Sequence, residues 1–485
     1  METLSRRVAL RAGLASTAVV GGLAAGASEA QAAPVGAAAT TTTTGEGWIS
    51  VLDHGAVGDG TTDDTAAIQA ALNAAVTSKK SVYFPAGRVY QVRNQLTAQG
   101  LTDVVISGHG ATVALAGGPP SVKGQLAMLR LQNCARVKLV GLTLHDTVRE
   151  HQYDGVRIVT STGIVVEGVR VQSVRFNGIV VFDATPRSSD DIVITNCTTE
   201  DTRFGISSNG RDVRITDNHV AMDWPSTEEA RRYNGVHPGY GSDSDYFDGI
   251  CVYAGADRTV IANNTVTEIG QSGIWVEAAS NVVIADNTIF ACQLHGIEID
   301  GTADVAHSVD GRAVGIAITG NVVIDSINGN INLIQTTGAT VVGNRVVNSK
   351  ATYKATCIAA NFYTTKVTIT GNQVRQANPA LPAIFVTGNT TEHPDGIATE
   401  VTIAWNTVDA AIPYAAPTET VVIQRTGAGL ITAQASLKTS GKVIAGGGLG
   451  IGNSVAATSV GSVVRKMEVF SSTGLSLGWI PIYNS

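Results

Sequence analysis

A short phrase repeated along the middle of the chain constrains the fold more than any other feature. The phrase is apolar-x-apolar-x-x-Asn, and its copies end at Asn218, Asn264, Asn287, Asn321, Asn344, Asn372 and Asn406. A second phrase, Gly-apolar-x-apolar, recurs in step with it from Gly155, Gly178, Gly205, Gly249, Gly273 and Gly296. Its closest copies are 23 residues apart. Self-similarity at this period is typical of a solenoid, in which each coil contacts only the coils beside it.

Each repeat is expected to form one coil of short strands. Apolar residues alternate along the strand segments, and Gly, Asn, Asp, Ser and Thr fill the turns between them. Asn at the same place in successive coils can form a ladder in which each side-chain amide bonds to the next. We therefore expect the Asn at this position of successive repeats, the Asn column, to have a structural role. Cys197 takes the Asn place in one coil, which predicts a small, buried side chain there.

Composition narrows the class of partner. The chain of 485 residues carries a net charge of −7, with a pI near 5.7. This balance argues against a nucleic-acid partner, whose usual footprint is a basic stripe, but an acidic polysaccharide could still bind in a local cleft. The five Cys are scattered and include no Cys-x-x-Cys pair, so we expect neither a metal knuckle nor a cofactor.

The N-terminus has the pattern of an export signal. Ser5-Arg6-Arg7-Val8-Ala9-Leu10 is a twin-arginine motif, and Ala30-Gln31-Ala32 is a cleavage pattern. We expect residues 1–32 to be a signal peptide, residues 33–47 to be a disordered Ala/Thr linker, and the protein to be secreted. The apolar run is too short for a membrane span, and no later segment predicts one. Twin-arginine substrates fold before export, so disulfides need not build the fold.

Two stretches after the linker carry a family resemblance. Residues 58–71 read GDGTTDDTAAIQAA and residues 83–87 read YFPAG. This combination resembles the entry signature of the pectate-lyase-like superfamily, which includes polygalacturonase-like hydrolases, mannuronan epimerases, lyases and phage tailspikes. The resemblance implies an all-β chain, a right-handed single-stranded parallel β-helix over residues 48–409, with a short helix capping its open end. For that helix we expect an N-cap at Thr62 or Asp63 and a buried face of Ile68, Leu72, Ala75 and Val76.

The last residues change in character. Residues 410–485 contain the Gly-rich segment 446–453, followed by two alternating apolar segments at 463–470 and 474–483. They resemble the terminal module of tailspike-like proteins, which implies a homotrimer. A plain C-terminal β-rich cap explains the same pattern.

The Gly-apolar phrase sorts side chains by face. The first and third residues after each Gly are apolar and must point inward, so the second and fourth point outward. Adjacent coils of such a helix lie about 4.8 Å apart. This alignment predicts one outer surface that holds Glu277, Glu298 and Asp300, flanked by Trp275 and Tyr253.

Three neighbouring carboxyl groups favour acid–base chemistry. They cannot all ionise comfortably, so at least one should hold its proton, as the general acid of glycoside cleavage must. Aromatic rings beside them would stack on sugar rings. The column before each Gly adds His295 as an acid, base or substrate-binding group. Asp248 in that column and Asn209 on the outer face are further candidates for substrate binding.

Two intervals break the period. From Asn218 to Asn264 is 46 residues, and from Asn287 to Asn321 is 34. We interpret each as a single coil with an inserted loop, one including residues 224–245 and the other about 302–312. The longer loop supplies candidate substrate-binding residues Arg231, His237, Tyr240 and Asp245. Its end, residues 243–249, departs by one residue from the spacing of a calcium loop, so no metal site is predicted.

The leading hypothesis is a secreted glycoside hydrolase that uses Glu277, Glu298 and Asp300, with His295 beside them. A polysaccharide lyase or uronate C5-epimerase is the alternative. It would abstract the proton next to a carboxylate neutralised by Arg or Ca²⁺, and would depend on Arg231, His237 and Tyr240. A non-catalytic glycan-binding protein on the same scaffold stays open, because a fold does not fix a function.

Overall fold

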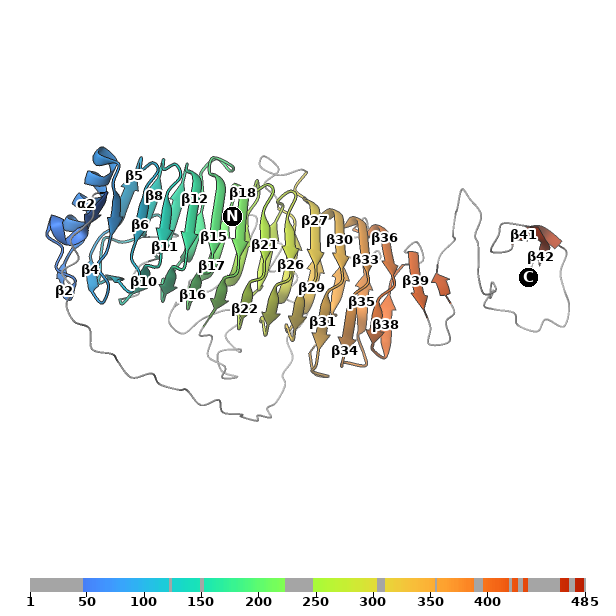
Figure 1. The fold of residues 1–485 in the computed structure, drawn as a ribbon. Helices are drawn as coiled ribbons and strands as arrows, with labels where there is room; N and C mark the ends of the chain where they lie inside the picture. The colour runs from blue at the N-terminus through green and yellow to red at the C-terminus, as the bar shows by residue number, and fades with distance from the viewer. Residues whose placement is uncertain are drawn as a thin grey trace.

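The computed structural model shows a solenoid of short parallel strands, capped at one end by a helix (Figure 1). It describes residues 47–121, 124–148, 152–222, 247–302, 310–353, 356–387, 396–417, 421–425, 431–434, 463–470 and 476–483. The signal peptide and most of the linker expected at the N-terminus lie outside these residues. No helix among those described is long and apolar enough to cross a membrane.

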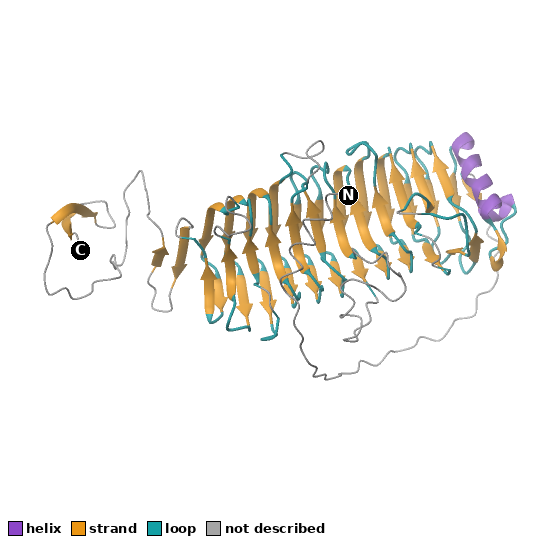
Figure 2. Cartoon of the chain, turned by 180° about the vertical axis from the view of Figure 1, so that it is seen from behind, coloured by secondary structure: helices purple, strands orange, loops and turns teal. Residues whose placement is uncertain are grey.

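The strands form three long sheets, which run the length of the molecule (Figure 2). Sheet A has 15 strands. In order along the sheet they are β1 (Trp48–Ser50), β3 (Ser81–Tyr83), β6 (Val105–Ser107), β9 (Lys138–Val140), β12 (Thr162–Glu167), β15 (Asp190–Thr195), β18 (Arg211–Thr216), β21 (Val260–Ala262), β24 (Val283–Ala285), β27 (Ala313–Thr319), β30 (Thr336–Val342), β33 (Thr365–Thr370), β36 (Thr399–Ala404), β39 (Val421–Arg425) and β40 (Ile431–Gln434).

Sheet B has 13 strands. They are β2 (Asp59–Asp63), β4 (Val89–Val92), β7 (Thr112–Leu115), β10 (Thr143–Asp146), β13 (Arg170–Gln172), β16 (Thr198–Glu200), β19 (His219–Ala221), β22 (Thr265–Thr267), β25 (Thr288–Phe290), β28 (Val322–Ile324), β31 (Arg345–Asn348), β34 (Gln373–Gln376) and β37 (Thr407–Asp409).

Sheet C has 12 strands and carries the Gly-apolar phrase. They are β5 (Leu96–Gln99), β8 (Ala127–Gln132), β11 (Asp154–Val159), β14 (Asn177–Val181), β17 (Phe204–Ser208), β20 (Asp248–Val252), β23 (Ile274–Glu277), β26 (His295–Asp300), β29 (Gly329–Leu333), β32 (Ile358–Ala360), β35 (Pro382–Val386) and β38 (Ile412–Ala415). From β3 to β38 the chain visits sheets A, B and C in turn, so each of these coils contributes one strand to each sheet. The predicted right-handed parallel β-helix is confirmed.

Strand register resolves the two long intervals. β18 pairs with β21, and β19 pairs with β22, so the interval from Asn218 to Asn264 is one coil, as predicted. In the same way β24 pairs with β27, and β25 with β28. The extra residues therefore enter the chain before β20 and after β26, at the two ends of sheet C strands. Most of both insertions, residues 223–246 and 303–309, lies outside the described residues.

The Asn column forms the predicted ladder at the corner between sheets A and B. Asn287 shows the pattern: its Nδ2 donates to Asn321 Oδ1 and to the Ile261 carbonyl oxygen, each at 2.9 Å. Its Oδ1 accepts from the main-chain N and the Nδ2 of Asn264, also at 2.9 Å. Cys197 stands at the start of the column, is buried as predicted, and donates its main-chain N–H to Asn218 Oδ1. The ladder thus satisfies the corner backbone groups that strand pairing leaves over.

The residue before each ladder Asn explains the rest of the phrase. It adopts the left-handed backbone conformation in every coil, for example at Asp217, Asn263, Asp286 and Gly320. Gly, Asn and Asp tolerate this conformation best, which is why they fill the position. Trp405 takes it in the last copy, where the residue is 52% exposed.

The Gly column follows from close packing at the corner that leads into sheet C. A Cβ atom on Gly178 would lie 2.6 Å from the carbonyl oxygen of Gly205, and one on Gly249 would lie 2.5 Å from that of Gly273. Successive backbones approach too closely there for any side chain. The column ends where Asn330 replaces Gly in β29.

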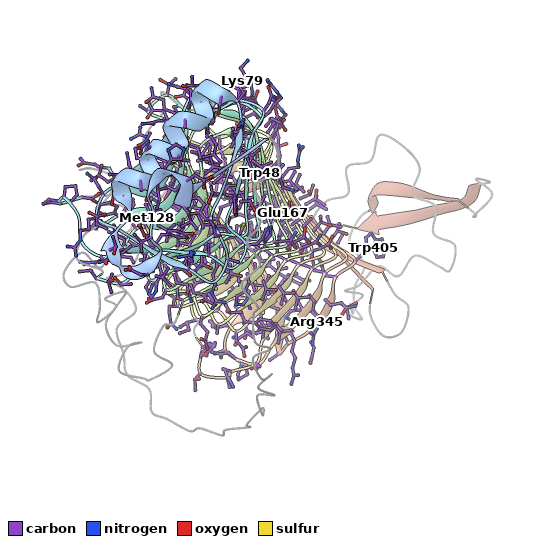
Figure 3. All side chains as sticks on the ribbon, turned by 60° about the vertical axis from the view of Figure 1, so that its left-hand side comes forward. Trp48, Lys79, Met128, Glu167, Arg345 and Trp405 are labelled. Atoms are coloured by element: carbon purple, nitrogen blue, oxygen red, sulfur yellow. The ribbon has the colours of Figure 1, made fainter. Side chains whose placement is uncertain are left out.

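Apolar side chains fill the space between the sheets along the whole solenoid. They belong to one continuous cluster, from Val51 near the N-terminal end to Ile403. Met128, labelled in Figure 3, is fully buried in it. The five cysteines are all buried and form no disulfide. Burial raises the pKa of Cys292 to about 12, which keeps that thiol protonated and unreactive.

The capping helix differs in detail from the prediction. Helix α2 (Thr65–Ser78) has Asp64 as its N-cap, not Thr62 or Asp63. The Asp64 carboxylate instead accepts from the N–H groups of Val57 and Gly58, which ties the preceding loop to the helix start. The buried face is Ile68, Ala71, Leu72 and Ala75, whereas Val76, predicted to be buried, is 39% exposed. A short 3-10 helix, η1 (Val51–His54), precedes α2.

Strand pairing continues beyond residue 409, where we expected the solenoid to end. β38 pairs with β35 and completes the coil begun by β36, and β39 pairs with β36, so sheets C and A each continue by one parallel strand past the expected boundary. β41 (Val463–Phe470) and β42 (Ser476–Tyr483) form an antiparallel hairpin, the element expected of a small C-terminal β module.

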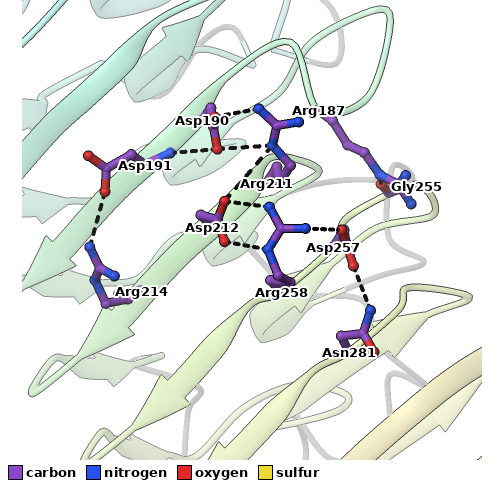
Figure 4. Close-up of polar contacts among 10 residues, drawn as sticks. All are labelled: Arg187, Asp190, Asp191, Arg211, Asp212, Arg214, Gly255, Asp257, Arg258 and Asn281. Carbon is purple, nitrogen blue, oxygen red and sulfur yellow. Dashed lines mark hydrogen bonds and ion pairs between the residues drawn. The ribbon is translucent and has the colours of Figure 1, made fainter.

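A polar network follows the outer edge of sheet A across several coils (Figure 4). Arg211 binds Asp190, and Arg258 binds both Asp212 and Asp257. The arginine side chains are 42–50% exposed, so each pair adds little stability in water. Most of these pairs join successive coils, so the network follows the register set by the strands. We therefore treat it as a structural feature of the solenoid.

The ladder gives a testable prediction. Asn287→Ala removes one rung and leaves buried groups of Asn264 and Ile261 without partners, at a cost of roughly 1–3 kcal/mol for each group. Asn406 is the last Asn of the column, and its bonds to Asn372 and to the Ile369 carbonyl oxygen are only partly buried, so water can replace them and Asn406→Ala should cost less. The measurement is the unfolding midpoint in urea. Equal losses for the two variants would show that the ladder does not stabilise the stack.

Candidate active site

The predicted acidic surface lies on the outer face of sheet C. Strand register pairs Trp275 on β23 with Glu298 on β26, and Glu277 with Asp300. Between these residues the side chains of Ile274, Val276 and their partners on β26 point into the core. The structure therefore places the three carboxyl groups on the same face of two adjacent strands, Glu277 on β23 and Glu298 and Asp300 on β26, whose backbones lie about 4.8 Å apart.

This outer face is more covered than strand alternation alone predicts. Glu298 is only 4% exposed, and the outward-facing Ser207 and Cys251 on the preceding strands are fully buried. Trp275, Glu277 and Asp300 are half-buried. Glu298 is thus the most enclosed of the three acids.

Two neighbouring side chains lie against Glu298, and one of them hydrogen-bonds to it. The Ser272 hydroxyl donates a short hydrogen bond to Glu298 Oε2, and His295 Nδ1 lies 3.3 Å from the same oxygen. Ser272 is fixed in turn, because its main-chain N donates to Asp248 Oδ1 at 2.9 Å. The carboxyl group sits between the hydroxyl and the imidazole. The arrangement is therefore not a Ser-His-acid triad, in which the imidazole would contact the hydroxyl.

A chain of amides reaches His295 from the other side. Thr387 Oγ1 donates to Asn361 Oδ1 at 2.5 Å, and Asn361 Nδ2 donates to Asn332 Oδ1 at 2.6 Å. Asn332 Nδ2 then lies 3.3 Å from His295 Nε2. Since the Asn332 oxygen is occupied by Asn361, its amide nitrogen faces the ring as a donor. His295 Nε2 must accept, so the proton of the neutral ring is on Nδ1, facing Glu298.

Gly329 makes room for the imidazole. It is the register partner of His295, and a Cβ atom there would lie 2.8 Å from His295 Cδ2. The next residue, Asn330, is buried and replaces the usual Gly of the repeat. The coil after the acids is therefore shaped around His295.

Aromatic rings continue the surface toward the N-terminal coils. The Tyr253 ring packs edge-on against both Trp275 and Phe182, with ring centres 5.8 Å apart in each pair. Burial raises the pKa of Tyr253 well above its ordinary value, so its hydroxyl stays neutral. These rings form an apolar strip beside the carboxyl groups, of the kind on which sugar rings stack.

Two predicted substrate-binding residues have structural contacts instead. Asn209 is 2% exposed, and its side chain donates to the Asp183 carbonyl and accepts from the Asp183 N–H. Asp248 is 1% exposed and positions Ser272. Arg231, His237, Tyr240 and Asp245 lie outside the described residues. Within the described part of the chain, no group of His, Cys, Asp and Glu side chains is arranged to hold a metal ion.

Sequence reasoning missed four members of this cluster: Ser272, Asn332, Asn361 and Thr387. The Gly-apolar phrase located the strands, and it is absent from β29 because Asn330 stands in place of Gly. Continuing the count of coils past Gly296 would have placed Asn332 beside Glu298.

Comparisons with known proteins agree with the fold. Residues 131–321 match the family model described as right handed beta helix region. The Dettilon tailspike protein is similar in structure, with a TM-score of 0.58 and 20% identity over 75% of this chain and 68% of that one. The A-module of the Azotobacter vinelandii mannuronan C-5 epimerase AlgE4 has a TM-score of 0.50 and 16% identity, over 77% of this chain and 99% of that one. PfbA, a surface adhesin of Streptococcus pneumoniae, has a TM-score of 0.50 and 14% identity, over 80% of this chain and 100% of that one.

A search of curated protein sequences gives no match. At these identities the solved structures establish a shared fold and no more. These neighbours are a tailspike, an epimerase and an adhesin, so the right-handed parallel β-helix fold is confirmed, and the likeness does not assign an activity.

The amide chain gives a testable prediction about His295. In long-range ¹H–¹⁵N spectra at neutral pH, the neutral ring should carry its proton on Nδ1. Asn332→Asp puts an acceptor opposite Nε2, so the proton should move to Nε2. Asn73→Asp makes the same chemical change on the exposed face of α2 and should leave the His295 signals unchanged. A wild-type ring protonated on Nε2 alone would contradict the assignment.

Proposed function

We propose that this right-handed parallel β-helix protein is a polysaccharide-cleaving glycoside hydrolase whose reacting groups are Glu298, Glu277 and Asp300. The observation that carries the proposal is the register of β23 and β26, which sets Glu277 beside Asp300 and Trp275 beside Glu298. Glycoside cleavage needs one protonated carboxyl group and one ionised carboxylate on either side of the bond. Neighbouring carboxyl groups in different surroundings supply that pair.

Glu298 is the general acid in this proposal. Burial and nearby negative charge both favour the neutral form of a carboxyl group, and Glu298 is the most buried of the three acids. The Ser272 hydroxyl fixes one of its oxygens, which orients the group without supplying a compensating charge. His295 lies within 3.3 Å and positions the acid or returns its proton after cleavage.

Asp300 and Glu277 are more exposed and supply the ionised carboxylate. One of them activates a water molecule or attacks the sugar directly. Because both lie within one strand spacing of each other, the backbone register is compatible with either route.

Trp275 is proposed to hold the sugar next to the reacting bond. Its strand lies about 4.8 Å from that of Glu298, close to the length of one sugar ring along a glycan chain. A ring stacked on Trp275 would therefore present its linkage to Glu298. The chain of the glycan then runs along the solenoid axis, across the strands of sheet C.

A lyase or epimerase is less well supported by the described residues. Both reactions need the substrate carboxylate to be neutralised, and a uronate placed beside Glu277, Glu298 and Asp300 would meet negative charge instead. The residues that this alternative requires, Arg231, His237 and Tyr240, lie outside the described part of the chain.

Glu298→Gln tests the assignment, because it keeps the shape and removes the transferable proton. On a glycan that the wild-type protein cleaves, the rate should fall by about 10²–10⁴-fold. Glu167→Gln is the matched control: Glu167 lies on sheet A, where it pairs with Lys138, and Figure 3 labels it. The control should cleave at the wild-type rate.

The assay follows reducing ends and ultraviolet absorbance of unsaturated uronate over a panel of polysaccharides. New reducing ends without absorbance are expected. Absorbance together with reducing ends would identify a lyase. Full cleavage by both Glu298→Gln and Glu277→Gln would remove the carboxyl groups from the mechanism. Glycan binding with no chemical change, including none in the NMR spectrum of the polymer, would leave a binding protein.

A further inference from the structure

The outer face of sheet C has a second charged region, far from the acids. Arg130 on β8 and Arg157 on β11 are register partners, so two guanidinium groups stand side by side on adjacent strands. The residues that flank Arg130, Leu129 and Leu131, are buried in the core, which fixes the arginine on the outer face. Both arginines belong to the same outward column as Trp275 and Glu298.

The two arginines differ in their hydrogen-bond partners. Arg157 Nη1 donates to Asp154 Oδ2 at 2.6 Å and to the Gly124 carbonyl oxygen. Among the residues that the structure describes, Arg130 has no hydrogen bond or ion pair, and its Nε is buried without a partner. An unpaired guanidinium that is partly removed from water has lost hydration and gained nothing in return.

The local electrostatics make this placement costly. Burial and the neighbouring charge of Arg157 lower the pKa of Arg130, although an arginine stays charged at neutral pH. The charge of the Asp154 carboxylate opposes this lowering of the Arg130 pKa. Asp154 is fully buried, already bonded to Arg157 and Asn177, and burial raises its pKa to about 6. The three groups together keep one net positive charge when Asp154 is ionised, and more when it is protonated.

We propose that Arg130 and Arg157 form an anion-binding subsite that holds a carboxylate or sulfate group of an acidic polysaccharide. The planar guanidinium of Arg130 matches the two oxygens of either group. An anion there would supply the partner that Arg130 lacks and would relieve its repulsion from Arg157.

The position of the subsite says which kind of glycan fits. β11 and β26 are five strand steps apart in sheet C, so Arg157 and Glu298 are separated by about 24 Å along the solenoid axis. The Phe182, Tyr253 and Trp275 rings lie between these positions, and the Arg157 guanidinium lies 5.6 Å from the centre of the Phe182 ring. An anionic sugar is thus held several units from the reacting bond, while the acids exclude anionic groups from the bond itself.

The anion subsite stands on the arginines alone. The statement that its ligand is also the chain that is cleaved rests on the function proposed above. Binding and cleavage must therefore be measured separately.

The test is calorimetric titration of three oligosaccharides of matched length: oligogalacturonate, a sulfated carrageenan fragment and a neutral malto-oligosaccharide. Wild-type protein should bind at least one anionic probe more tightly than the neutral one, and added salt should weaken that binding. Arg130→Gln should weaken it about tenfold or more, since a charge-assisted pair is lost. The probe that responds identifies the anion as carboxylate or sulfate.

Two controls separate this role from a structural one. Arg345→Gln removes an exposed arginine from sheet B, labelled in Figure 3, and should leave binding unchanged. The thermal midpoint of Arg130→Gln should equal or exceed that of wild type, because the substitution removes a like-charge contact and no hydrogen bond. Glu298→Gln should keep anion binding even though cleavage is lost.

Equal binding of anionic and neutral probes by wild type would overturn the proposal. So would an Arg130→Gln variant that is folded and binds anionic probes as tightly as wild type. If anion binding behaves as expected and no glycan is cleaved, the subsite stands and the proposed hydrolase activity fails.

Discussion

Coil-to-coil register is the constraint on which the rest of this molecule depends. Parallel backbone hydrogen bonds set the spacing between coils, but they would also permit slippage along the strands. The Asn ladder prevents it, because each amide must meet both the amide of the next coil and a carbonyl oxygen on the sheet A strand of the preceding coil. The Gly column acts at another corner, where successive backbones approach too closely for a side chain. With both corners fixed, every outward residue of sheet C has a defined neighbour on the next coil.

The functional surface follows from that register. Residues far apart in the sequence become partners, such as Arg130 with Arg157, and Glu277 with Asp300. Read along the solenoid axis, the outer face of sheet C changes from basic to aromatic, then to acidic, then to amide. A polymer lying along the axis would meet these regions in order. This order suits recognition of a long glycan with its charged groups at intervals, and it separates the anchoring of the chain from the chemistry on it.

Much of the fold and of the outer face of sheet C could be predicted, because the repeat fixes the position of each residue within its coil. Counting from each Gly placed Trp275, Glu277, Glu298 and Asp300 on one face correctly, and the two long intervals were resolved as single coils. Counting from the repeat failed where the repeat itself changes, at Asn330, so Asn332 and the amide side chain that bonds to it were missed.

The repeat also predicts which way a side chain points but not which residues cover it. Asn209 and Asp248 were chosen for their positions, yet both are buried in contacts with the backbone of their neighbours. The N-cap of α2 lies one residue past the predicted Asp63, and the Asp64 side chain there binds the preceding loop at Val57 and Gly58 instead of capping the helix, a contact that capping patterns do not contain.

The central claim is that one outer face of the solenoid binds a glycan along its axis, with the reacting bond at Glu298. An experimental structure of the Glu298→Gln variant with a bound oligosaccharide tests this claim most directly. The account predicts a glycan extended across the strands of sheet C, with one sugar on Trp275 and a glycosidic oxygen within hydrogen-bonding distance of residue 298. A glycan bound on sheet A or sheet B, or one lying across sheet C with no linkage near residue 298, would contradict it.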